Sequence, residues 1–214
     1  KVTTLFGTFQ SAAAFNSDLS TWNVAKVETL ESMFRGASLF NSNISSWDIS
    51  KVTSLAEAFY ETTEFESDLS GWNVSSVSTL RSTFRGASRF TSNLRSWDVE
   101  KVTSLEAVCF EASAFNSDLS IWNVAKVGTL ASAFHGASSF NSDLSNWNVG
   151  RITDMRSSFE SSSMFNSDLS NWNVEKVTSL SGTFSGASEF DSDISNWAVG
   201  NVVNMSDTFR SPGP

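Results

Sequence analysis

Hydrophobic positions recur along this chain with a period of 25 residues. Tryptophan marks the period most clearly, because all eight copies fall at 22, 47, 72, 97, 122, 147, 172 and 197. Such a strict period indicates one structural unit stacked on copies of itself. We number each unit 1 to 25 from Lys1, so that every tryptophan occupies position 22. Eight units fill 200 residues of the sequence, and a partial ninth follows.

Eight positions of the unit are apolar or small in nearly every copy and are predicted to point inward. Position 2 is Val or Ile, position 5 is Leu or Met, positions 9 and 15 are Phe, and position 12 is small. Position 19 is Leu or Ile, position 22 is Trp, and position 24 is Val or Ile. Position 9 departs once, where Cys109 replaces the ring and Phe110 follows, as though the ring had moved one place. We expect one continuous core.

The spacing within the unit also predicts local structure. Positions 22 and 24 alternate with mainly polar neighbours, the period of a short strand with one face buried. Positions 5 and 9 are four apart, which fits a turn or two of α-helix or 3₁₀-helix. Glycine at position 11 of the even units suits a helix end. The predicted fold is a right-handed solenoid of 25-residue coils, each with one short strand, a helical turn and loops.

We expect a single solenoid over residues 1–210, and a Pro/Gly tail or linker over 211–214. The first unit matches the repeat in every core position and does not resemble a cap. Repeat proteins cover their end faces with atypical units. We therefore expect further coils, a cap or a neighbouring subunit before Lys1 in the working protein.

Charge narrows the range of partners. The chain has 14 Lys+Arg against 23 Asp+Glu, a net charge of -9. This balance argues against binding nucleic acid or an anionic membrane, since both need a basic surface. No apolar run approaches the roughly 18 residues of a spanning helix. We therefore predict no nucleic-acid partner and no membrane insertion in this segment.

The repeat resembles known leucine-rich repeats. Leu19-x-x-Trp22-x-Val24-x-x-Val27-x-x-Leu30 is similar to the general leucine-rich pattern. The whole unit, F-N-S-D-L-S-x-W-N-V-x-K-V-T-x-L-x-x-x-F-x-G-A-S-x-F, resembles the BspA-like leucine-rich-repeat surface proteins over residues 1 to about 210. This resemblance implies a secreted or cell-surface location and a role in attachment or recognition. One departure is Val27, which stands where the leucine-rich ladder has Asn.

Two columns suggest ligands but have simpler explanations. Exposed tryptophans could stack on sugars, but a column of eight exposed rings would promote aggregation. We predict that they are buried, with each indole N–H on a carbonyl. Position 18 is Asp in six units and Asn in two, which could suit Ca²⁺. We instead predict that these side chains cap turns by accepting backbone N–H groups, and we expect no metal or cofactor.

Candidate binding residues come from two surface columns. Small polar side chains line the predicted strand face at position 23: Asn23, Asp48, Asn73, Asp98, Asn123, Asn148 and Asn173. Position 10 instead varies on the constant frame, which is typical of recognition by repeat proteins: Arg35, Tyr60, Arg85, Phe110 and His135. Three glycosylation sequons begin at Asn43, Asn73 and Asn204.

Catalysis has little support in this sequence. Cys109 and His135 are each unique, and they lie 26 residues apart, about one coil. We expect a buried thiol and a surface imidazole rather than a nucleophile–base pair. The predicted function is a non-enzymatic extracellular or cell-surface module for adhesion, or a structural stalk or fibre. Its partners would be proteins, glycans or further copies of the chain joined end to end. The alternative is a carbohydrate-binding domain, with ice or calcium binding less favoured.

Overall fold

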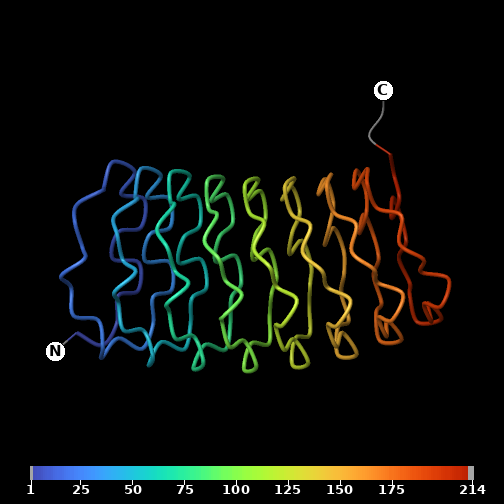
Figure 1. Ribbon diagram of the computed structural model, residues 1–214, viewed down its shortest axis with the longest axis horizontal. Helices are drawn as coiled ribbons and strands as arrows, with labels where there is room; N and C mark the ends of the chain where they lie inside the picture. The colour runs from blue at the N-terminus through green and yellow to red at the C-terminus, as the bar shows by residue number, and fades with distance from the viewer. Residues whose placement is uncertain (1, 212–214) are drawn as a thin grey trace.

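The chain forms a stack of coils that follow one another along a single axis in chain order (Figure 1). The computed structural model describes residues 2–211. Lys1 and most of the predicted tail at 211–214 lie outside this range. The stacked coils confirm a tandem-repeat solenoid, although the local structure within each coil differs from the prediction.

No helix and no extended strand occurs between residues 2 and 211, so neither the strand at positions 21–25 nor the helical turn at positions 5–9 is confirmed. Single parallel bridges join neighbouring coils at position 4 instead. They link Thr4, Thr29, Ser54 and Thr79 in sequence, and Thr129, Asp154, Ser179 and Asn204 in sequence. The coils thus pair in parallel, at a position well away from the tryptophan segment.

The backbone of positions 5–12 alternates between bonds to the next coil and bonds within its own coil. The N–H groups at positions 5, 7, 9 and 11 donate to the next coil, and those at 8, 10 and 12 donate to a carbonyl three residues back. In the fifth coil, Ala107 N–H donates to Ala131 O at 2.9 Å and Val108 N–H to Leu105 O at 3.1 Å. An α-helix needs successive N–H groups to bond four residues back. The ladder between coils therefore excludes a helix here.

Left-handed backbone at positions 7 and 11 makes these turns possible. At position 11, φ is 68° at Gly136 and 55° at Glu111; at position 7, φ is 50° at Ala107. A positive φ at the third residue of a tight turn favours glycine. Glycine at position 11 consequently supports a turn, and the interpretation as a helix end was wrong.

The eight predicted core columns are buried in the middle coils and form one cluster that runs from Leu5 to Trp197. Two further columns are buried that the hydrophobic pattern did not predict, at positions 8 and 17. Position 8 varies in residue type: Met33, Ala58, Thr83, Val108, Ala133, Ser158, Thr183 and Thr208. Position 17 is serine, at residues 42, 67, 92, 117, 142 and 167.

Hydrogen bonds explain why hydroxyl side chains are tolerated in these two columns. Thr83 Oγ1 donates to the carbonyls of Leu55 and Leu80, at 3.0 and 2.8 Å. At position 17 the serine oxygen accepts the N–H of position 19 in the preceding coil, as in Leu119 N–H to Ser142 Oγ at 2.7 Å. Buried polar groups with partners carry little penalty. These serines and threonines therefore act as core residues that also join adjacent coils.

Aromatic rings stack along the axis. Neighbouring rings of the position 15 column have centroids 5.7–6.1 Å apart. From Trp97 to Trp197 the indoles are nearly parallel and 6.4–6.5 Å apart. Each indole N–H from Trp47 onward donates to a carbonyl of the preceding coil at 3.0–3.1 Å. The prediction of a buried column is confirmed for these seven, while Trp22 in the first coil is 39% exposed.

Candidate functional site

The position 23 column immediately precedes tight turns and does not lie on a strand. All seven side chains are exposed, and each side-chain oxygen accepts the N–H of position 25 at 3.1–3.2 Å. These residues are Asn23, Asp48, Asn73, Asp98, Asn123, Asn148 and Asn173. Hydrogen bonds from Ser50 lower the pKa of Asp48. One oxygen of each side chain is thus engaged within the turn. The second carboxylate oxygen of Asp, or the amide nitrogen of Asn, remains available to solvent or a ligand.

The position 18 column caps turns, as predicted. In all eight coils the side-chain oxygen accepts the N–H of position 20, at 2.8–3.0 Å. The donated backbone N–H holds the pKa of Asp18, Asp68, Asp143, Asp168 and Asp193 below the ordinary value. Within residues 2–211, no group of three His, Cys, Asp or Glu side chains is placed to hold a metal ion.

Polar concavities follow this edge between neighbouring coils. One of about 450 Å³ is lined by Asn116, Asp118, Asn141 and Asp143 together with serines. A second, of about 360 Å³, repeats the arrangement around Asn166, Asp168 and Asp193. Their linings offer amides, carboxylates and hydroxyls, the groups that bind sugar hydroxyls through hydrogen bonds.

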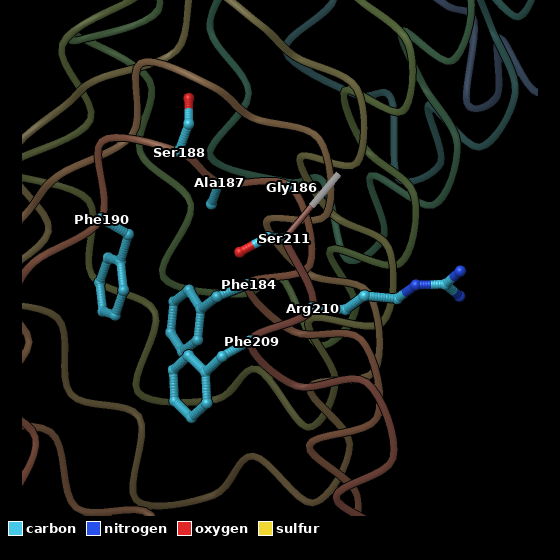
Figure 2. A pocket seen from close by; sticks show the side chains of 8 residues that line it. All are labelled: Phe184, Gly186, Ala187, Ser188, Phe190, Phe209, Arg210 and Ser211. Atoms are coloured by element: carbon cyan, nitrogen blue, oxygen red, sulfur yellow. The ribbon is translucent and has the colours of Figure 1, made fainter. Parts of the chain in front are cut away.

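Cavities that expose core side chains lie instead at the two ends of the stack. Figure 2 shows the C-terminal cavity, of about 270 Å³, where Phe184 lies over Phe209 and Phe190 lies beside them. The Arg210 side chain points away from these rings (Figure 2). At the other end, Val2, Leu5 and Trp22 help to line a cavity of about 430 Å³. Core columns contribute half of the C-terminal lining and most of the N-terminal lining, so each cavity borders the end of the core.

The variable column at position 10 forms a continuous ladder of side-chain contacts, here called the position-10 ladder: Arg35, Tyr60, Arg85, Phe110, His135 and Glu160. Arg35 lies 4.9 Å from the Tyr60 ring centroid. Arg85 lies 5.4 Å from the Tyr60 ring and 3.9 Å from the Phe110 ring. Phe110 stacks on His135 at 4.4 Å. Adjacent coils therefore bring together residues that lie 25 apart in the sequence.

Phe110 and Cys109 have separate environments. Phe110 lies in the position-10 ladder, as expected from its place in the variable column, and its ring does not replace the missing core ring. Cys109 is buried, and burial raises the pKa of its thiol well above the ordinary value. No hydrogen bond joins Cys109 to His135 in the described part of the chain. His135 Nδ1 is buried without a hydrogen-bond partner and lies 3.4 Å from Glu160 Oε2.

One charged residue beside the ladder was missed from the sequence. Glu57, at position 7, forms ion pairs with Arg35 at 2.8 Å and Arg81 at 2.6 Å, and only 13% of its side chain is exposed. The three residues lie on three successive coils. The sequence could have indicated these ion pairs, because Arg35 and Arg81 lie 22 and 24 residues from Glu57 and so fall in neighbouring columns on adjacent coils.

The three sequons adopt similar turns. Asn43, Asn73 and Asn204 are exposed, and each side-chain oxygen accepts the N–H of the serine two residues later, at 3.0–3.1 Å. The serine hydroxyls of Ser45 and Ser206 donate to the same oxygens. The acceptor nitrogens are therefore on the surface of the stack.

Between residues 2 and 211, no helix is long and apolar enough to cross a membrane.

Comparisons with known proteins identify a repeat family. No curated protein matches the sequence. A chain in the crystal structure of a TLR13–ssRNA13 complex is similar with 11% identity and a TM-score of 0.20, over 89% of this chain and 41% of that one. This chain thus spans less than half the length of that structure. The family described as "Mycoplasma protein of unknown function, DUF285" matches residues 1–94, 53–157 and 130–212. Because these overlapping matches cover nearly the whole chain, the protein belongs to the DUF285 repeat family.

Proposed function

We propose that this chain is a non-enzymatic extracellular or cell-surface module that acts in adhesion or as a structural stalk. The observation that carries the proposal is a constant frame bearing one variable contact column. Ladders of hydrogen bonds fix every coil, while the position-10 ladder changes chemistry from coil to coil. Repeat proteins commonly use such varied columns to recognise partners.

The surface location is supported by the repeat itself. The unit resembles the BspA-like surface proteins, and the chain belongs to the DUF285 repeat family. The stack is elongated, with its two ends far apart along the axis (Figure 1). An elongated frame with polar sides suits display away from a surface, with a protein or glycan as partner.

The non-enzymatic assignment is supported by the environments of the two most reactive side chains. Cys109 is buried with a raised pKa, which disfavours the thiolate that nucleophilic catalysis needs. His135 is stacked on Phe110 and faces Glu160. The two groups therefore have separate structural surroundings.

Accessibility on intact cells tests the surface location. Cells that produce the full-length protein would be treated with antibodies against the position-10 ladder, before and after lysis. We expect labelling of intact cells, and loss of the epitope after brief external protease treatment. A cytosolic marker protein serves as the control. Labelling that requires lysis would contradict the proposal.

Glycan binding is a second candidate, and the polar concavities favour it. They repeat along one edge with the same amide, carboxylate and hydroxyl lining. A glycan array would test this candidate, with Asp118→Ala combined with Asp143→Ala as the variant and Asp118→Asn with Asp143→Asn as the turn-preserving control. Binding lost only in the alanine variant supports a glycan site. If the array gives no signal and the protein shows no thermal hysteresis, the glycan and ice candidates fail. Protein adhesion or a structural stalk then remains as the proposed function.

A further inference from the structure

Arg85 is held between two aromatic rings. Its guanidinium carbon lies 5.4 Å from the Tyr60 centroid and 3.9 Å from the Phe110 centroid. Tyr60 belongs to the preceding coil and Phe110 to the following coil. Cations over ring faces are stabilised electrostatically, and such stacking fixes the side chain before any partner arrives.

Nearby arginines differ because their charge is already neutralised. Arg35 and Arg81 pair with Glu57, and Arg89 pairs with Glu64 at 2.5 Å. Arg95 pairs with Asp118. Among residues 2–211, Arg85 forms no ion pair. A guanidinium stacked through its faces keeps its in-plane N–H donors, which match a planar carboxylate in a two-pronged hydrogen bond.

Negative charges lie on both sides of Arg85 along the axis. Gly86 follows Arg85, and its equivalents on the adjacent coils are Glu61 and Glu111, both exposed. A Cβ added at Gly86 would lie 3.2 Å from Glu61 Cγ, so this side chain lies against the glycine. Neither glutamate forms an ion pair with Arg85. The surface therefore alternates negative, positive and negative over three coils.

We infer that Arg85, Glu61 and Glu111 form a docking site for a protein segment that presents a carboxylate flanked by cationic side chains. This inference deepens the proposed recognition role and rests on it. The carboxylate accepts from Arg85, and the flanking cations pair with the two glutamates. A polyanion fits less well, because the flanking glutamates and the net charge of -9 repel it.

A blocked peptide, Lys-Gly-Glu-Gly-Lys, provides the probe. Its central glutamate is flanked by a lysine on each side, so its order of charges is complementary to Glu61, Arg85 and Glu111. We expect this peptide to shift the Arg85 side-chain Nε–Hε resonance in ¹⁵N-labelled protein. The charge-inverted peptide, Glu-Gly-Lys-Gly-Glu, should bind about tenfold more weakly, because its charges face like charges. In a separate titration, inorganic phosphate replaces the peptide, to test whether Arg85 binds any simple anion.

Substitution at Arg85 separates recognition by the guanidinium from simple charge. Arg85→Lys keeps the charge but loses the planar fork, so peptide affinity should fall about tenfold. Arg85→Gln should abolish the binding, while Arg151→Lys, at an exposed position 1, should leave it unchanged. Thermal melts confirm that each variant remains folded.

Three outcomes would overturn the inference: an unmoved Arg85 resonance, equal peptide affinity in Arg85→Gln, or a phosphate response equal to that of the peptide. The last would identify a simple anion site. These results are independent of antibody labelling on intact cells, so failure of the docking site is distinguishable from failure of the surface assignment.

Discussion

From Trp97 onward, each tryptophan joins neighbouring coils in two ways. Trp122 is 4% exposed, stacks on Trp97 and Trp147 at 6.5 Å, and donates its indole N–H to Leu94 O at 3.0 Å. Large aromatic rings dominate core energetics, and a satisfied N–H removes the penalty of burying it. At the residue scale, position 22 is therefore both a packing element and a fastener between coils.

Replacing this ring tests its contribution. Trp122→Ala should lower the free energy of unfolding by about 3–5 kcal/mol, because it leaves a cavity between two coils. Trp197 is less buried and stacks on only one indole, Trp172. Trp197→Ala should therefore cost less, as measured by denaturant melts. Equal losses at the two sites would count against the stacked core.

The buried thiol gives a second expectation at this scale. Burial raises the pKa of Cys109, and only the thiolate is strongly reactive. Iodoacetamide at pH 8 should therefore label unfolded protein rapidly and native protein very slowly. The rate in guanidinium chloride is the internal reference. Native labelling as fast as that reference would show that position 9 of the fifth coil is open to solvent.

Sequence could identify core positions wherever residue type is constant. The columns of Trp, Phe, Leu and Val were predictable because burial keeps them apolar in every unit. Positions 8 and 17 were not, since one varies from Met33 to Thr83 and the other is serine. Their burial depends on hydrogen-bond partners in the adjacent coil, such as Leu55 O for Thr83. Hydrophobic periodicity contains no information about those partners.

At the element scale, tight turns replace the expected helix and strand. Spacing showed which side chains face inward, and both a helix and this series of turns place positions 5 and 9 inside. The two structures differ in where alternate N–H groups donate. That choice depends on the neighbouring coil, as in Ala107 N–H to Ala131 O. A single unit of sequence therefore could not distinguish them.

Glycine substitutions test the left-handed turns. Gly136 has φ 68°, and an added Cβ would meet Glu111 Cγ at 3.2 Å. Gly136→Ala should destabilise the protein by about 1–2 kcal/mol through backbone strain. Gly71 has ordinary φ and open space around it. Gly71→Ala should be neutral or stabilising by about 0.4–1 kcal/mol, because the unfolded chain loses freedom. Melts in which both variants respond alike would contradict the turn geometry.

The position 18 turns predict a pH dependence. The folded pKa of Asp143 is lowered chiefly by the backbone N–H of Ser145. Its stabilising effect is therefore complete above the ordinary value of 3.8 and is lost as pH falls through the lower folded value. Asp143→Asn keeps the turn, as Asn43 and Asn93 do naturally. We expect this variant to lose less stability than the parent below pH 3.8 in melts over an acid series. Identical acid profiles would argue against the cap.

At the scale of the whole molecule, the coils act as neighbours in a one-dimensional stack. Stability in such arrays is approximately a sum over units and their interfaces. The tandem architecture was predictable from period alone. Much of the candidate site was not: position 10 was identified as variable, but the stacking of Arg85 between Tyr60 and Phe110 depends on coil register. Only the three-dimensional repeat makes residues 25 apart direct neighbours.

Amide hydrogen exchange tests the central claim, that coils are joined through positions 5–11 rather than through a strand at the tryptophan segment. In the fifth coil, Ala107 and Cys109 N–H groups donate to Ala131 and Ala133 at 2.9 and 2.8 Å. We predict strong protection of these two amides. The exposed Asn123 N–H has no bond to a neighbouring coil in the described structure and should exchange much faster. Strong protection at Asn123 together with rapid exchange at Ala107 and Cys109 would contradict the account.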